Sequence, residues 1–146
     1  MRTSILVVDD DPNNTKLLAM VLSPNHEVVI ANSGEEALQF IALSRPDLIL
    51  LDVMMPVMDG FAVCEQLKAN QTTCEIPVIF VTASGESIDE ARGLEMGGED
   101  YITKPFSPPV LRARVKNAME RTKLKSHLES LVEGLDVEQI LGNELP

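Results

Sequence analysis

Several groups that could handle phosphate chemistry follow short apolar runs in the sequence. Asp9 and Asp10 come directly after the aliphatic residues 5–8, and Asp52 follows a second aliphatic run. Carboxylates held a few ångströms apart repel by roughly 4 kcal/mol per pair at an effective dielectric near 20, so they require a cation. Mg²⁺ suits this role because it takes one or two carboxylates and fills its other positions with water and phosphate. These residues therefore predict a Mg²⁺ site that can hold a phosphoryl group.

Two further residues supply complementary groups. Thr82 ends a third apolar run, and Lys104 follows a fourth. The ammonium of Lys104 can neutralise one phosphoryl oxygen, and the hydroxyl of Thr82 can donate a hydrogen bond to another. Asp52 is then the carboxylate that could carry the phosphoryl group covalently.

The elements that must position these groups alternate along the chain. Five apolar runs read as strands, and the longer segments between them have the apolar spacing of helices. Strict alternation predicts a parallel sheet with helices on both faces and right-handed connections. Ligands of such sheets bind beyond the carboxyl ends of the strands, where the acids project. Four residues are expected to cap helices, namely Asp11, Ser33 (with Glu36), Asp59 and Ser107.

Four stretches taken together resemble the receiver domains of bacterial two-component response regulators. They are "ILVVDDDP", "PDLILLDVMMPVMDG", "IPVIFVTAS" and "GGEDYITKPF", and the resemblance covers about residues 3–121. It implies an α/β fold with a doubly wound, five-stranded parallel sheet of the flavodoxin-like order 2-1-3-4-5. An extended C-terminal helix would follow this sheet.

The resemblance also implies a role for each site residue. Asp52 would accept a phosphoryl group from a sensor histidine kinase or a histidine phosphotransfer protein. Thr82 and Tyr101 would form a switch that changes conformation and association through the fourth and fifth helices. Lys104 precedes a proline whose peptide bond is usually cis in this family. The metal ligands would be Asp9, Asp10, Asp52 and the backbone carbonyl of Met54.

Two other functions remain open from the sequence. Asp9 and Asp11 form the Asp-x-Asp pattern of haloacid-dehalogenase-like phosphohydrolases, but Pro12 and Asn13 displace the threonine which that family has, and no paired acids follow Lys104. A receiver that only docks partners, without phosphorylation, is the second alternative. The complete set of acids, hydroxyl and lysine argues against it. His127 lacks the neighbours of a phosphorylated histidine and is expected to be solvated.

Composition narrows the setting. The chain has 146 residues and a net charge of −11, which suit one domain with an appendage. Residues 1–107 hold 17 acids against 6 bases, so we expect no contact with nucleic acid. No apolar run is long enough to cross a bilayer, and no signal peptide is recognisable, so we expect a cytoplasmic protein. Cys64 and Cys74 are expected to be reduced thiols, with Cys64 in the core.

The C-terminal part is expected to form one long helix. After Pro108 and Pro109 in the first turn, residues 110–132 contain no Gly or Pro, and Gly134 is a plausible stop. Such a helix is about 39 Å long and should project beyond the sheet. We therefore divide the chain into a receiver at residues 1–121 and a helical extension or linker at residues 122–146. A second helical turn is expected from Asp136, with Gln139 as its capping partner.

Two sets of apolar residues lie on this helix. Leu111, Val115 and Ala118 suit docking on the sheet. A second set recurs at 4-3-4 spacing and predicts a homodimer or a partner-binding surface: Leu124, Leu128, Leu131 and Leu135. Asp100 and Arg114 match a salt-bridge set of winged-helix regulators, but Val110 replaces its glutamate, so we do not expect dimerisation through that particular face.

Overall fold

The computed structural model describes residues 2–83 and 87–134, in which five strands alternate with five helices. The strands are β1 (Ser4–Val8), β2 (Glu27–Ala31), β3 (Leu48–Leu51), β4 (Val78–Thr82) and β5 (Asp100–Thr103). The helices are α1 (Pro12–Leu22), α2 (Gly34–Leu43), α3 (Gly60–Ala69), α4 (Ser87–Glu95) and α5 (Pro108–Glu133). The predicted alternation is confirmed.

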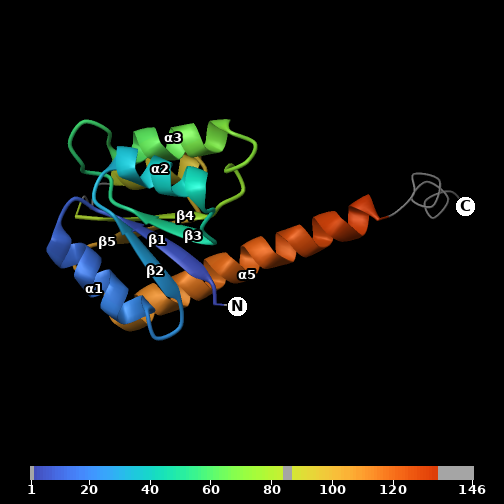
Figure 1. Cartoon of the computed structure of the whole chain (residues 1–146), viewed down its shortest axis with the longest axis horizontal. Helices are drawn as coiled ribbons and strands as arrows, with labels where there is room; N and C mark the ends of the chain where they lie inside the picture. The colour runs from blue at the N-terminus through green and yellow to red at the C-terminus, as the bar shows by residue number, and fades with distance from the viewer. Residues whose placement is uncertain (1, 84–86, 135–146) are drawn as a thin grey trace, which may run out of the picture.

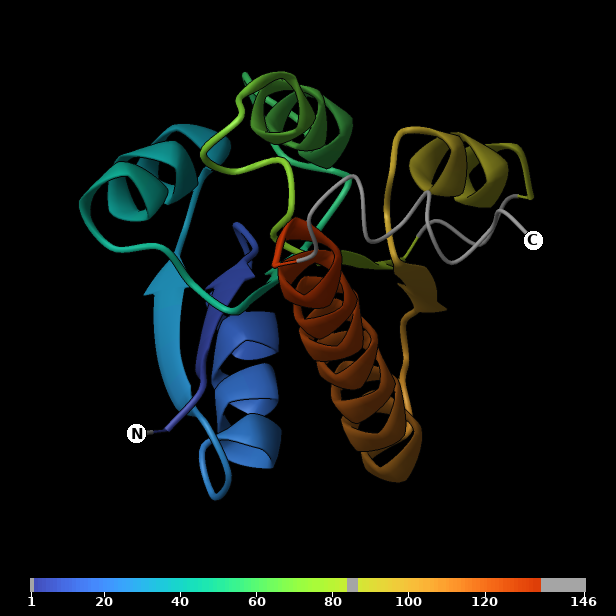
Figure 2. The same cartoon turned by 90° about the vertical axis from the view of Figure 1, so that its right-hand side faces the viewer.

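The strands form one parallel sheet in the order β2-β1-β3-β4-β5, which confirms the predicted topology. Helices α1 and α5 cover one face, and α2, α3 and α4 cover the other (Figures 1 and 2). Because both faces are covered, every residue of β3 and β4 is buried, which explains their unbroken apolar sequences. Two apolar cores result, one on each side of the sheet.

Three of the four predicted caps bind their helices through the side chain. Asp11 accepts from the backbone of Asn13, Ser33 from that of Glu36, and Asp59 from that of Ala62. Ser107 is the N-cap of α5, as predicted, but its side chain makes no capping hydrogen bond. Pro109, the second helical residue, has no N–H that could donate to it.

Helix α5 has a docked half and a projecting half (Figure 1). Leu111, Val115 and Ala118 are buried against the sheet, as predicted. The helix then leaves the body, and Gly134 caps it in a right-handed conformation. Leu135 and the turn expected at Asp136 to Gln139 lie outside the described residues. No helix in the described part of the chain is both long enough and apolar enough to span a bilayer.

Candidate functional site

The acids that follow β1 and β3 meet at the carboxyl edge of the sheet. Val8 lies beside Leu51 in the parallel pair, so the next residues, Asp9 and Asp52, are neighbours. The Asp52 amide donates to the Val8 carbonyl at 2.9 Å. One carboxylate oxygen from each of Asp9, Asp10 and Asp52 lies within 4.8 Å of the others. Asp9 and Asp52 are buried whereas Asp10 is exposed, so the cluster opens to solvent on one side.

Lys104 supplies the positive charge nearest to these acids. Its Nζ lies 2.6 Å from Oδ2 of Asp9 and 3.8 Å from Oδ1 of Asp52. The Lys104 amide donates to the carbonyl of Thr82, which fixes the lysine at the end of β5, and its peptide bond to Pro105 is cis, as the resemblance implied. In this arrangement Lys104 neutralises Asp9 first and Asp52 only in part.

The negative charge of Asp52 is consequently only partly compensated by the groups around it. Burial and the neighbouring Asp9 charge raise its pKa to about 6. Lys104, a hydrogen bond from the Thr82 side chain and a backbone hydrogen bond from Met54 oppose that rise. Asp52 is therefore a carboxylate near neutral pH that is incompletely compensated, which suits a group that takes up a metal and a phosphoryl group.

The donor set fits a hard divalent cation. It offers carboxylate oxygens and an open side, and the buried acids hold one lysine between them. The side chain of Met54 is 67% exposed, and its main chain forms a hydrogen bond with Asp52. Asp11 and Asp59 are occupied as helix caps, which matches the role predicted for them. His127 is exposed, also as predicted.

Thr82 and Tyr101 connect this edge to the helices. Thr82 is fully buried at the end of β4, and the Tyr101 ring is buried on the neighbouring strand. That ring lies 6.1 Å from the ring of Phe80, which lies 5.4 Å from that of Phe61. The guanidinium of Arg92 on α4 stacks 4.4 Å from the centre of the Phe61 ring. An aromatic row therefore runs from β5 to α3 beneath α4.

The backbone of β5 is joined directly to α5. Arg114 donates to the carboxylate of Asp100 at 2.8 Å and to the carbonyl of Tyr101 at 3.3 Å. The Asp100–Arg114 pair that the sequence suggested is thus formed within one chain. Movement of Tyr101 would therefore be felt at α5 as well as at α4.

Gly60 is a site residue that the sequence analysis missed, since it was treated only as the residue after a cap. A Cβ added there would lie 2.2 Å from the carbonyl oxygen of Asp52. The start of α3 therefore packs on the backbone of Asp52, and only glycine permits that approach. The "DG" that opens α3 was the available signal, but its meaning depends on a contact with a residue eight positions earlier.

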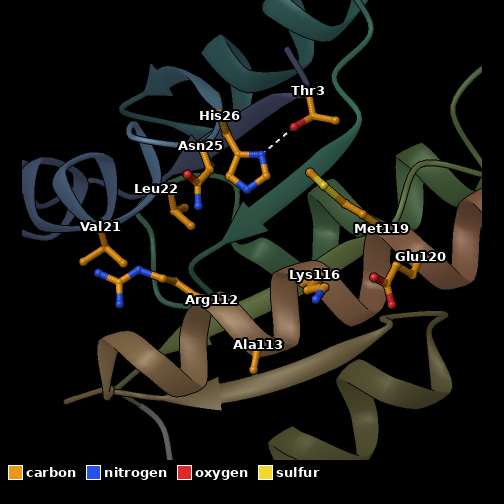
Figure 3. A pocket seen from close by; sticks show the side chains of 10 residues that line it. All are labelled: Thr3, Val21, Leu22, Asn25, His26, Arg112, Ala113, Lys116, Met119 and Glu120. Atoms are coloured by element: carbon orange, nitrogen blue, oxygen red, sulfur yellow. Dashed lines mark hydrogen bonds between the residues drawn. The ribbon is translucent and has the colours of Figure 1, made fainter. Parts of the chain in front are cut away.

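A separate cavity lies away from this edge. It has a volume of about 370 Å³ and is lined by the end of α1, the α1–β2 turn and the middle of α5 (Figure 3). His26 and Thr3 are hydrogen-bonded on one side, and Arg112 and Lys116 stand on the other. None of the clustered acids lines it, so it is no part of the candidate site.

Comparisons with known proteins agree with this geometry. The family model of the response regulator receiver domain matches residues 5–116. The alkaline phosphatase synthesis transcriptional regulatory protein PhoP of Bacillus subtilis is 44% identical over 125 residues, which are 85% of this chain and 51% of that protein. The DNA-binding response regulator MtrA of Mycolicibacterium smegmatis is 40% identical over 124 residues, which are 84% of this chain and 53% of that protein.

A solved structure agrees as well. The receiver domain of the Francisella response regulator 1452 superimposes with a TM-score of 0.76 at 33% identity, over 83% of this chain and 99% of that one. The chain spans about half the length of the curated relatives it matches. The matched stretch contains β2 to β5, all of β1 except Ser4, and all of the clustered acids. The chain belongs to the receiver domain family of two-component response regulators.

Proposed function

We propose that this receiver accepts a phosphoryl group on Asp52 from the phosphohistidine of a sensor histidine kinase or a histidine phosphotransfer protein. The supporting observation is the position of Asp52 between a buried acid, an ammonium and a hydroxyl. A carboxylate oxygen of Asp52 would attack phosphorus while the N–P bond breaks. The imidazole keeps the electron pair and then takes up a proton. The chain is thus a phosphoacceptor rather than an enzyme with its own substrate.

The metal site would hold Mg²⁺ through Asp9, Asp10, Asp52 and the backbone carbonyl of Met54. Bound Mg²⁺ would supply positive charge to the phosphoryl oxygens. The mutual distances of the three carboxylates and the exposed side of Asp10 support this assignment. With Mg²⁺ present, small phosphodonors would also label Asp52, and slow hydrolysis would return the chain to its starting state.

Lys104 and Thr82 would respond to the phosphoryl group. Lys104 now lies 2.6 Å from Asp9, and a phosphoryl oxygen on Asp52 would compete for the same ammonium. The hydroxyl of Thr82 would turn toward another phosphoryl oxygen. This movement would leave space into which the ring of Tyr101 could move. Because Tyr101 contacts Phe80 and its carbonyl binds Arg114, this change would reach α4 and α5.

The projecting half of α5 would carry the response outward. We place the receiver at residues 1–121 and the extension or linker at residues 122–146, because Ala118 is the last buried residue of α5. The exposed leucines of this extension would mediate association with a second copy. The free state of both cysteines suits the cytoplasm, where sensor kinases present their phosphohistidines.

The test is labelling by acetyl phosphate in Mg²⁺. The wild type should take up close to one phosphoryl group per chain, and Asp52→Asn should take up none. Asp11→Asn is the matched control, because it removes a neighbouring carboxylate while asparagine still caps α1. Labelling of Asp52→Asn at the wild-type level would refute the assignment. Release of many equivalents of phosphate per chain would instead indicate a phosphohydrolase.

A further inference from the structure

The projecting half of α5 carries an apolar face that its own chain does not cover. We call Leu124, Leu128 and Leu131 the leucine stripe; their side chains are 59%, 53% and 54% exposed. Of the residues that the structure describes on α5, only Leu111, Val115 and Ala118 are buried. A row of three leucines left in water on one helix is an unfavourable arrangement that burial against a partner would relieve.

The leucine stripe faces away from the body of its own receiver. At 3.6 residues per turn, its centre lies about 140° around the helix from the face formed by Leu111, Val115 and Ala118. Lys125 lies on the side nearer the body, where its Nζ binds Glu75 at 2.9 Å. A second helix can therefore lie against the leucine stripe while both receivers remain on the outer sides of the pair.

The spacing of the leucine stripe is that of a two-stranded coiled coil. With Leu128 at position a of a heptad, Leu124 and Leu131 fall at position d. The preceding a and d positions are Arg121 and Asn117, so the apolar seam starts where the helix leaves the body. Both of these polar residues lie beside the receiver, which explains why the seam does not extend further up α5.

The charges beside the seam distinguish the two possible orientations. Glu120 is at position g and Lys125 at the following position e, and these positions face each other across a parallel pair. Glu120 is exposed on the flank of α5 (Figure 3) and forms no ion pair within the described part of the chain. In an antiparallel pair, position e faces position e and position g faces position g, so Glu120 and Lys125 would not meet and the attraction would be lost. Charge complementarity therefore favours the parallel arrangement.

We propose that the leucine stripe pairs in parallel and in register with that of a second copy, and that Glu120 of each chain binds Lys125 of the other. The inference rests on the association with a second copy proposed above and adds its orientation, its register and the contact between Glu120 and Lys125. Lys125 would then exchange its partner in the monomer, Glu75, for a glutamate of the second helix. The described seam spans little more than one heptad, so the isolated chain should pair weakly and reversibly.

Cysteine cross-linking tests the orientation. In a Cys74→Ser background, Leu124→Cys places two thiols across one d layer of a parallel pair, whereas antiparallel helices hold them far apart. Cys64 stays in place because it is fully buried and burial raises its thiol pKa. Ser126→Cys is the control, since position f points outward. We expect at least about tenfold more disulfide dimer from Leu124→Cys under mild oxidation in full-length chains.

Sedimentation separates the two ways in which the test could fail. A wild type that remains monomeric at high concentration would contradict the association itself. A wild-type dimer with equal cross-linking of Leu124→Cys and Ser126→Cys would refute only the parallel register. Leu128→Ser/Leu131→Ser should abolish the dimer, and a dimer that persists in this variant would place the contact elsewhere.

A charge exchange tests the Glu120–Lys125 contact. Glu120→Lys alone and Lys125→Glu alone should each weaken dimerisation by about threefold to tenfold, because each turns two attractive contacts into repulsive ones. The double variant Glu120→Lys/Lys125→Glu should return to the wild-type value. Glu75→Gln is the control, because it removes the ion pair that Lys125 forms in the monomer and would give up in the dimer. Additive losses in the double variant would contradict the proposed pairing.

Discussion

The acid edge of the sheet and the projecting half of α5 depart from the usual burial rule in opposite directions. At the acid edge, Asp9 and Asp52 are 1% and 6% exposed, although charged groups are normally solvated. On the projecting half of α5, leucines are more than half exposed. Strand β3 follows the rule, because all four of its apolar residues are buried. Both departures support the proposals above, in which a cation with a phosphoryl group would complete the acid edge and a second helix would cover the projecting half of α5.

The two departures differ in how tightly the fold fixes them. The acid edge is fixed by strand pairing, by the contact of Gly60 with the Asp52 backbone and by Lys104. Within the described residues, the projecting half of α5 is held by helix continuity and by two partly exposed ion pairs, Arg121–Glu99 and Lys125–Glu75, which contribute little. A precise chemical site requires the first kind of support. A reversible protein contact requires only a presented surface.

Two leucines on α5 give the sharpest contrast between docked and projecting residues. Leu111→Ala should lower the free energy of unfolding by about 2 to 5 kcal/mol, because it opens a cavity under a fully buried side chain. Leu128→Ala should change it by less than about 0.5 kcal/mol, because that side chain is already in water. Urea unfolding at low protein concentration measures both. Equal losses would mean that the projecting half is docked in solution.

The acid edge should be destabilising when Asp52 is charged. Its pKa in the folded chain, about 6, lies above the reference value of 3.8, so the folded state holds the proton more firmly. The stability gained from that proton is present in full below pH 3.8 and is lost as the pH rises to about 6. Asp52→Asn should therefore raise the free energy of unfolding by about 3 kcal/mol above pH 6 without Mg²⁺, and by little below pH 4.

Unfolding of the wild type and Asp52→Asn between pH 3.5 and 8 measures this difference. Asp11→Asn provides the control, since that carboxylate is exposed and caps a helix. A constant difference between wild type and Asp52→Asn across the whole range would mean that Asp52 does not titrate in the folded chain as described.

Much of the fold followed from local patterns in the sequence. The strand positions and the docked residues of α5 were predicted because unbroken aliphatic runs and 3.6-residue spacing record burial directly, whereas the sheet order was implied by the family resemblance. The acids were placed together because strand ends of a parallel sheet share one edge. The features that were missed depend on contacts between distant residues. The approach of Gly60 to Asp52 leaves no local pattern, and neither does the shorter distance of Lys104 to Asp9 than to Asp52.

Asp10, the exposed member of the acid cluster, tests metal binding with fewer side effects than Asp9 does. Asp10→Asn should weaken Mg²⁺ binding by about tenfold or more while leaving the fold intact, because it removes a ligand from the open side. Asp9→Asn would also remove the negative charge that Lys104 binds, and the one oxygen left on asparagine could not serve both Lys104 and the Asp11 amide. Thermal unfolding with increasing Mg²⁺ reports the affinity. Unchanged Mg²⁺ stabilisation with a lower melting temperature would make Asp10 structural.

The smallest expected effect concerns the loop that leads from Asp52 to α3. Val57 has a φ of +68°, a conformation that β-branched residues rarely adopt, and its side chain is 96% exposed. Packing of the Val57 side chain therefore does not compensate for this backbone strain. Val57→Gly should raise the free energy of unfolding by about 1 kcal/mol, because glycine adopts positive φ without a Cβ clash. Val57→Ala keeps the Cβ and should increase the free energy of unfolding by less.

The same two variants should leave phosphoryl uptake unchanged, since Val57 lies at the loop surface. A loss of stability in Val57→Gly would mean that the loop changes its conformation in solution, and a loss of phosphoryl uptake would mean that this loop helps to hold Asp52 in place.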